Sequence, residues 1–215
     1  MSGLIRLLAC SLLAGTALLG IGALLHPMLG GDAATQLRTI SATSYWRALH
    51  LAMLAGSGLA IAGVWVRLLT DRATSAPLVA SLALISIGTA LNALNVAFMA
   101  GSGTHMAALF ASGQSEMQSV FEATHPIGLM SARFGNFIVA LGALVLGVVE
   151  SSDATRPRWL AWLAWLAAAG GFVGVCFFDE ASRVALAAVA LLSGWEVATA
   201  GRALVFTATA DRATR

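Results

Sequence analysis

Apolar residues are grouped along this chain in six long runs, each separated from the next by a more polar segment. The runs cover about 5–26, 48–69, 77–100, 126–149, 159–178 and 183–206. An apolar run of roughly 18 or more residues is long enough to cross a bilayer as a helix. The pattern therefore predicts an all-α fold, a polytopic transmembrane bundle of six helices.

The composition indicates a single membrane domain over residues 1–215. Of the 215 residues, 59% are hydrophobic and 10% are charged, whereas soluble domains carry about 25% charged residues. The formal net charge of +2 offers no basic face to a nucleic acid. The expected partner of this chain is the lipid bilayer.

Arginine residues are distributed unevenly between the two ends of the predicted bundle. Eight lie on the side of the N-terminus, namely Arg6, Arg67, Arg72, Arg156, Arg158, Arg202, Arg212 and Arg215, and three lie on the other side, namely Arg38, Arg47 and Arg183. Because cytoplasmic loops are enriched in arginine, both termini are expected in the cytoplasm and the protein in the inner (plasma) membrane. Two outer loops of about twenty residues would then cap the outer face.

All four histidines and every methionine after the first fall on the predicted outer side. The histidines are His26, His50, His105 and His125, and the methionines are Met28, Met53, Met99, Met106, Met117 and Met130. This asymmetry makes the outer layer the first place to look for a cofactor or metal site.

One hypothesis for this layer is haem b. The segments "WRALHLAMLAG" (46–56) and "FEATHPIGLMS" (121–131) both place a histidine four residues after an aromatic residue, which suggests an internal duplication and a bundle of three hairpins. His50 and His125 would then lie at equal depth on facing helices, where two histidines can ligate one haem iron. Nearby glycines would make room for the ring, namely Gly56, Gly58, Gly128 and Gly135.

The stretch "EATH", Glu122 to His125, resembles the Glu-x-x-His element that haem A synthase carries at the outer start of alternate helices. The resemblance implies a haem ligand at His125, although Arg47 stands where the second such element would have an acid. The favoured function is an electron-transfer or redox accessory membrane protein. Other membrane subunits, a quinol or a periplasmic redox protein are its expected partners, and enzymatic activity is left open.

Copper is the alternative. Each histidine has a methionine within five residues, in the pairs His26–Met28, His50–Met53, His105–Met106 and His125–Met130. Imidazole and thioether groups together suit copper, and Cu(I) above all. The second hypothesis is therefore a copper-binding membrane protein for storage, delivery or oxidation.

Polar residues also descend into the fourth run. Glu122, His125, Arg133 and Asn136 share an arc of about 80° on a helix, and Asn92 and Asn95 lie at a similar depth on the third run. Buried polar groups in a bilayer mark either a functional site or an interhelical contact. Arg133 is expected to pair with Glu196 or with an anionic group such as a haem propionate. The structural alternative is a contact between helices that joins Arg133, an asparagine and Glu196.

A third interpretation needs no cofactor. Proline is favoured at the first position of a helix, and an acid just before a helix favours its positive end. On this interpretation Pro126 and Glu122 mark the start of a helix and have no role in binding. The protein would then be a structural subunit or a small transporter. The segments "LLHPMLGGD", "YWRALH" and "RPRWLAWLAWLAA" together resemble a broad group of uncharacterised six-span bacterial membrane proteins, which implies the six-helix fold and no particular activity.

Overall fold

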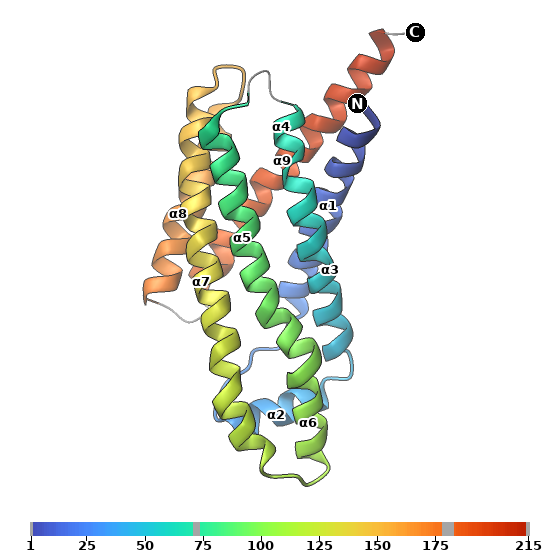
Figure 1. Cartoon of the computed structure of the whole chain (residues 1–215), viewed down its shortest axis with the longest axis vertical. Helices are drawn as coiled ribbons and strands as arrows, with labels where there is room; N and C mark the ends of the chain where they lie inside the picture. Colours follow the sequence, from blue (N-terminus) through green and yellow to red (C-terminus); the bar gives the residue numbers. More distant parts are fainter. Residues whose placement is uncertain (1, 71–73, 178–182, 214–215) are drawn as a thin grey trace.

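The structure, a computed structural model, describes residues 2–70, 74–177 and 183–213. These residues are almost entirely helical, and none of them lies in a strand (Figure 1). The elements are α1 (Ser2–Leu25), α2 (Ala33–Ala42), α3 (Trp46–Val64), α4 (Val66–Leu69), α5 (Ala76–Phe98), the π-helical turn η1 (Met99–Gly103), α6 (Thr104–Ala111), α7 (Met117–Ser152), α8 (Arg158–Phe177) and α9 (Arg183–Ala213).

Within the described residues, six helical segments are long and apolar enough to cross a membrane. They are Ser2–Leu25, Trp46–Leu69, Ala76–Ala111, Met117–Ser152, Arg158–Phe177 and Ala187–Thr209. The prediction of an all-helical membrane protein with six spanning helices is therefore confirmed. The third and fourth segments are 36 residues each, so they extend well beyond the runs expected at 77–100 and 126–149.

The spanning helices pack in the order of the chain. α1 contacts α3, α3 contacts α5, α5 contacts α7, α7 contacts α8, and α8 contacts α9. α9 runs obliquely behind the bundle and returns to α1, and both chain termini lie at one end of the molecule (Figure 1). The helices thus form a ring, closed by the contact between the first and the last of them.

The other end is capped by helices rather than by loops. α2 crosses beneath the bundle, and α6 and the first turns of α7 extend past it (Figure 1). α2 begins at Asp32, whose side chain accepts a hydrogen bond from the Thr35 backbone N–H at 2.8 Å, a standard N-cap. A buried cluster holds this capped end together: Leu37, Ile40, Trp46, Met99, Met106, Ala107 and Phe121.

Pro126 is not a helix start, as the third interpretation assumed. It lies inside α7, which begins at Met117, and Glu122 lies in the second turn of the same helix. The carboxylate of Glu122 is exposed and accepts a hydrogen bond from the Gln118 side chain at 2.9 Å. A proline inside a helix removes one backbone hydrogen bond. Packing against neighbouring elements, rather than intrinsic helix propensity, therefore stabilises this part of α7.

The glycines of α7 serve the contact with α5. A Cβ atom at Gly135 would lie 2.6 Å from the Gly88 carbonyl oxygen, and one at Gly128 would lie 2.6 Å from Oδ1 of Asn95. The close backbone approach at Gly135 is typical of helix pairs in membranes. Gly128 and Gly135 both face α5.

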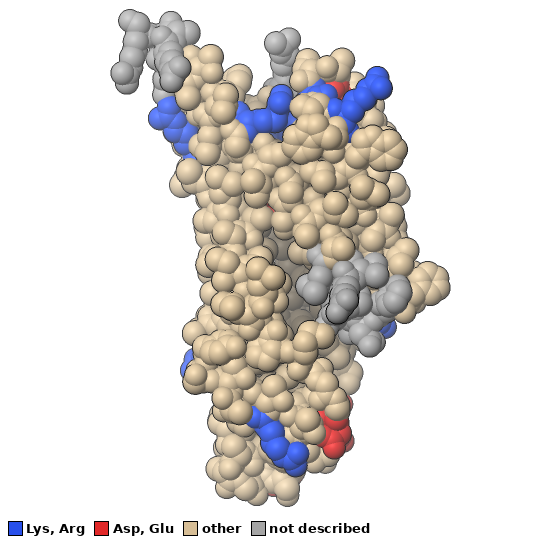
Figure 2. All heavy atoms as spheres, turned by 180° about the vertical axis from the view of Figure 1, so that it is seen from behind, with Lys and Arg blue, Asp and Glu red and all other residues tan. Residues whose placement is uncertain are grey.

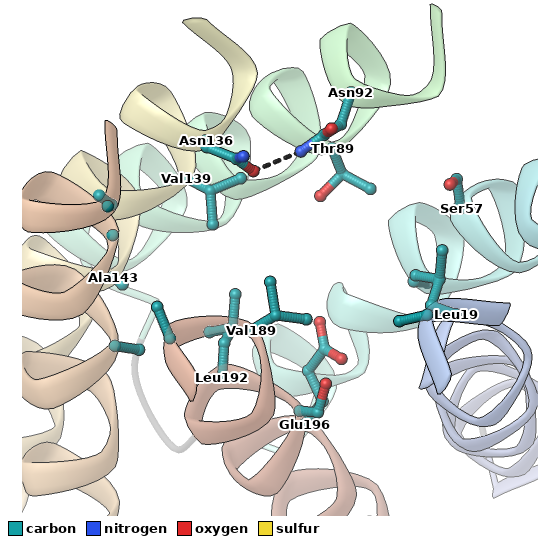
Figure 3. Close-up of a pocket in the computed structure, with 18 of the residues that line it drawn as sticks. Leu19, Ser57, Thr89, Asn92, Asn136, Val139, Ala143, Val189, Leu192 and Glu196 are labelled. Carbon is teal, nitrogen blue, oxygen red and sulfur yellow. Dashed lines mark hydrogen bonds between the residues drawn. The ribbon is translucent and has the colours of Figure 1, made fainter. Parts of the chain in front are cut away.

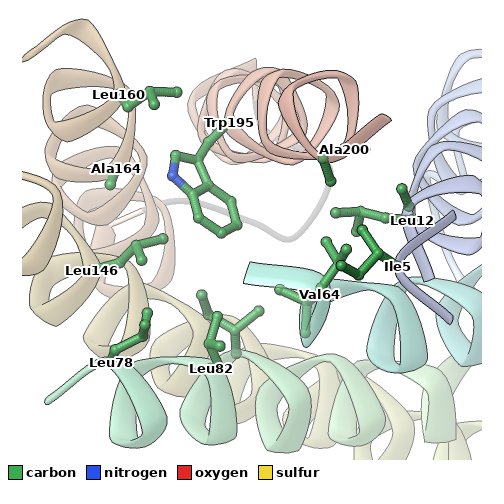
Figure 4. Packing of buried hydrophobic residues seen from close by; sticks show 14 residues of the cluster. Ile5, Leu12, Val64, Leu78, Leu82, Leu146, Leu160, Ala164, Trp195 and Ala200 are labelled. Atoms are coloured by element: carbon green, nitrogen blue, oxygen red, sulfur yellow. The ribbon is translucent and has the colours of Figure 1, made fainter. Parts of the chain in front are cut away.

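The end that carries the termini is closed by the largest core cluster. Figure 4 shows the Trp195 ring of α9 directed between α7 and α8, against Leu146 and Leu160. Beside it, the Glu150 carboxylate accepts from Arg67 Nε at 3.1 Å and from Trp195 Nε1 at 3.3 Å, and it also contacts Arg156. These buried contacts join α4, α7, α9 and the segment before α8.

Charge is concentrated at this same end. Figure 2 shows basic side chains gathered there, above a wide band of uncharged surface. The chain contains no lysine, so these side chains are arginines. Of the eight arginines assigned to this side, Arg72 and Arg215 lie outside the described residues. An uncharged band of this kind is the surface expected to face lipid.

Candidate functional site

The most compact group of candidate ligands lies between the end of α1 and the start of α3. His26 directly follows α1, and His50 lies in the second turn of α3. Their Nε2 atoms are 3.3 Å apart, and their ring centroids are 5.0 Å apart in an edge-to-face arrangement. His50 is only 2% exposed and His26 is half-buried. The structure thus brings together two histidines that are 24 residues apart in the sequence.

A hydrogen bond to the chain fixes which nitrogen of the His50 ring carries the hydrogen. Nδ1 of His50 lies 2.8 Å from the Trp46 carbonyl oxygen, and a carbonyl only accepts, so Nδ1 is the donor. Nε2 of the neutral His50 ring then has a lone pair. Nε2 of His26 lies within hydrogen-bond distance of this lone pair, and its role there depends on the tautomer of His26.

Burial lowers the pKa of His26, against the smaller opposing effect of its backbone bond at Pro27. A proton or a metal ion between the two Nε2 atoms would be shared by both rings. Metal-binding histidines commonly donate their other N–H to a backbone carbonyl, as His50 does to Trp46.

Trp46 covers both rings. Its centroid lies 4.4 Å from that of His50 and 4.9 Å from that of His26. The indole is 1% exposed, and its Nε1 donates to the Met99 carbonyl oxygen at 3.3 Å. Because this indole is anchored in the cluster of the capped end, it excludes water from one side of the histidine pair.

A thioether lies one helical turn away from the pair. Met53 follows His50 by three residues on α3, and Gly22 precedes His26 by four residues on α1, so both lie on the facing sides of these helices. A Cβ atom at Gly22 would lie 2.3 Å from Cγ and 2.9 Å from Sδ of Met53. Gly22 therefore provides the space into which the Met53 side chain extends.

The other residues of the predicted outer layer are dispersed. His105 is exposed on α6, Met106 is buried in the cluster of the capped end, and Met28 and Met130 are exposed. Among the described residues, no group of three or more His, Cys, Asp and Glu side chains could hold a metal ion. A metal site at the histidine pair would therefore need a third ligand other than His, Cys, Asp or Glu.

His125 has different neighbours from His50. Its ring stacks on Phe98 at a centroid distance of 6.2 Å and lies 4.5 Å from the centroid of Phe121. α5 packs between α3 and α7, which carry the two histidines. Nε2 of His50, the atom that would bind haem iron, faces His26 instead. His50 and His125 thus have different neighbours, and haem binding between them stays a prediction.

The polar residues of the fourth run divide into two groups. Glu122 is exposed at the capped end, whereas Arg133 and Asn136 line a cavity inside the bundle. In that cavity the Asn92 side chain donates to Oδ1 of Asn136. Glu196 lines the same cavity, and its carboxyl group is bonded to Thr16 at 2.7 Å. The asparagine contact between helices joins Asn92 to Asn136, a pair that sequence reasoning did not specify, and Thr16 is a partner of Glu196 that it missed.

No protein-family model, curated protein or solved structure shows a significant match to this chain. Fold and site together define a six-span membrane protein with a paired-histidine site at its capped end. What this site does must be inferred from its own geometry.

Proposed function

We propose that this protein binds Cu(I) through Nε2 of His26 and of His50, with the thioether of Met53 as a third ligand. One observation carries the proposal: Nε2 of the half-buried His26 and Nε2 of the buried His50 face each other at 3.3 Å. Two nitrogens held about 2.0 Å from one ion at a tetrahedral angle are about 3.3 Å apart. The pair therefore already has the spacing that a shared metal ion requires.

The choice of copper follows from the ligand types. Soft thioether ligands favour Cu(I), and imidazole binds copper in both oxidation states. Zinc sites are built from Cys, His and carboxylate ligands, and none of the described residues adds such a third ligand to this pair. The Met53 thioether, one helical turn from the pair, therefore favours Cu(I) over Zn²⁺.

Haem b between His50 and His125 stays a prediction that this geometry does not favour. Ligation would require Nε2 of His50 to turn away from His26. Copper binding at His26 and His50 does not need this movement.

In this proposal both termini are cytoplasmic, and the chain forms three hairpins in the inner (plasma) membrane. The arginines at the end with the termini support that orientation, and the contacts α1–α3, α5–α7 and α8–α9 support the hairpins. The histidine pair then lies near the non-cytoplasmic face. Holding or delivering copper outside the cytoplasm, with other membrane subunits or a periplasmic redox protein as recipient, is the function that fits this position.

The test is a competition titration of the purified protein with a chromophoric Cu(I) chelator under reducing conditions. We expect one high-affinity Cu(I) per chain. His50→Ala and His26→Ala should each weaken binding by a factor of about 100, since second-shell changes already cost 10–100-fold. Met53→Leu should weaken Cu(I) binding while leaving the weaker Zn²⁺ binding unchanged.

Matched controls are present in the chain. His105→Ala and Met130→Leu change the same residue types at exposed positions and should leave Cu(I) affinity unchanged. Cu(I) affinity that survives in both His26→Ala and His50→Ala, with the helical content intact, would rule out this site. Loss of Cu(I) in His105→Ala would move the site to α6.

A further inference from the structure

A second site lies deeper in the bundle, at the centre of the ring of helices. It is a cavity of about 290 Å³ lined by residues of all six spanning segments. Most of the lining is aliphatic or small, and the polar exceptions include Ser57, Thr89, Asn92, Asn136 and Glu196. Cavities near this size with an apolar lining and a few polar groups are typical of small-molecule sites.

One wall of the cavity carries an amide pair. Figure 3 shows Asn92 of α5 and Asn136 of α7 joined by a hydrogen bond from Nδ2 of Asn92 to Oδ1 of Asn136. An amide has two N–H donors and one acceptor oxygen. The bond between them leaves the amino group of Asn136 as a donor and the carbonyl of Asn92 as an acceptor at this wall.

The opposite wall carries a carboxylic acid. Glu196 of α9 is 8% exposed, and its side chain extends toward the space in front of the asparagines (Figure 3). The Thr16 hydroxyl lies 2.8 Å from the Leu12 carbonyl oxygen and donates to Oε2 of Glu196 at 2.7 Å. This bond holds the carboxyl group of Glu196 at the cavity wall.

The cavity is suited to a largely apolar ligand with polar groups at its two ends. Arg133 also lines it and has an interaction of its own. The amides of Asn92 and Asn136 and the hydroxyls of Ser57 and Thr89 are uncharged hydrogen-bonding groups. Figure 2 shows the molecule hollowed at mid-height on the face turned away in Figure 1, within the uncharged band. A ligand dissolved in the lipid could enter there.

We propose that this cavity binds the head group of a quinone or quinol. Hydrogen-bond donors on opposite walls match a flat neutral ring with one carbonyl oxygen at each end, which would accept from the Asn136 amide and from the Glu196 acid. The Asn92 carbonyl can accept from the hydroxyl of the reduced form. The apolar walls cover the ring faces, and the tail extends toward the lipid. His26 and His50 do not line this cavity.

The experiment uses the full-length protein in lipid nanodiscs, titrated with a decyl-substituted benzoquinone and monitored by quenching of tryptophan fluorescence. Saturable quenching is expected. Asn136→Leu and Glu196→Leu should each weaken binding about tenfold, the effect of losing one hydrogen-bond partner. Glu196→Gln keeps a neutral donor and should bind like the unaltered protein. Ser57→Phe fills the cavity and should abolish saturable quenching.

Controls separate this site from the copper site and from misfolding. His26→Ala should bind the quinone normally even where it has lost Cu(I), and Met130→Leu should have no effect. Variants are compared only where size-exclusion profile and helical content match those of the unaltered protein. Absence of saturable quenching, or its persistence in both Asn136→Leu and Ser57→Phe, would overturn the proposal. Tighter binding of oleate than of the quinone would assign the cavity to fatty acids instead.

Discussion

His50 is held from several sides at once. Its Nδ1 donates to the Trp46 carbonyl, the Trp46 ring covers one face, and His26 lies opposite Nε2. A side chain fixed in this way loses little entropy when it binds an ion, which is the benefit of preorganisation. By contrast, the exposed His105 has no such support on α6. His50 is therefore suited to be a ligand, and His105 is not.

At the other end of the molecule, Glu150 is the residue on which the packing depends most. Glu150→Ala removes the carboxylate from between the guanidinium groups of Arg67 and Arg156, both buried. Leaving buried charges uncompensated costs about 3–5 kcal/mol. We therefore expect a clear fall in the thermal unfolding midpoint in detergent, measured by circular dichroism.

The matched control for this prediction is Glu116→Ala, which removes an exposed carboxylate at the start of the same helix. It should leave the midpoint close to that of the unaltered protein. Glu150→Gln, which keeps an oxygen to accept from Trp195, should fall between the two. Equal midpoints for Glu150→Ala and Glu116→Ala would show that the buried ion contacts contribute nothing to stability.

At the scale of the elements, the α5–α7 pair is set by glycines. Gly135→Ala would bring a Cβ atom within 2.6 Å of the Gly88 carbonyl oxygen, a backbone atom that cannot move alone. Overpacking of this kind costs about 1–3 kcal/mol. The variant should therefore unfold at a lower temperature than the unaltered protein.

Gly20→Ala on α1 is the control, because a Cβ atom there meets nothing within 4 Å. Alanine has the higher helix propensity, so this variant should be as stable as the unaltered protein or slightly more so. A Gly135→Ala protein as stable as the Gly20→Ala protein would contradict the close helix contact.

The six spanning helices were predictable from the sequence because long apolar runs depend only on composition. Which of these helices pack against each other was not predictable. The equivalence of His50 and His125 rested on local likeness, but the approach of α3 to α1 depends on small residues such as Gly15 and Gly56. The pairing of Glu196 with Thr16 joins residues 180 positions apart. Patterns within one helix could not indicate either contact.

For the whole molecule, the two proposed sites lie at different depths of one ring of helices. Met53 connects them, since it follows His50 by one turn and also lines the central cavity. The position of both sites relative to the cell depends on the orientation of the chain. The copper proposal requires the capped end to face away from the cytoplasm.

That orientation can be tested by cysteine labelling. With Cys10 and Cys176, both exposed, replaced by alanine, Ser41→Cys and Ser112→Cys at the capped end should react with an impermeant thiol reagent in intact cells. Ser75→Cys, at the start of α5, should react only after the membrane is opened. All three serines are exposed. The reverse pattern would turn the histidine pair toward the cytoplasm.

The most direct test of the copper site is the X-ray absorption spectrum of the Cu(I)-loaded protein at the copper K edge. The proposed ligands predict two imidazole nitrogens and one sulfur in the first coordination shell. The sulfur contribution should disappear in Met53→Leu, and the imidazole contribution should fall by half in His26→Ala. A first shell without imidazole, or a spectrum unchanged when both His26 and His50 are replaced, would contradict the assignment of copper to this pair.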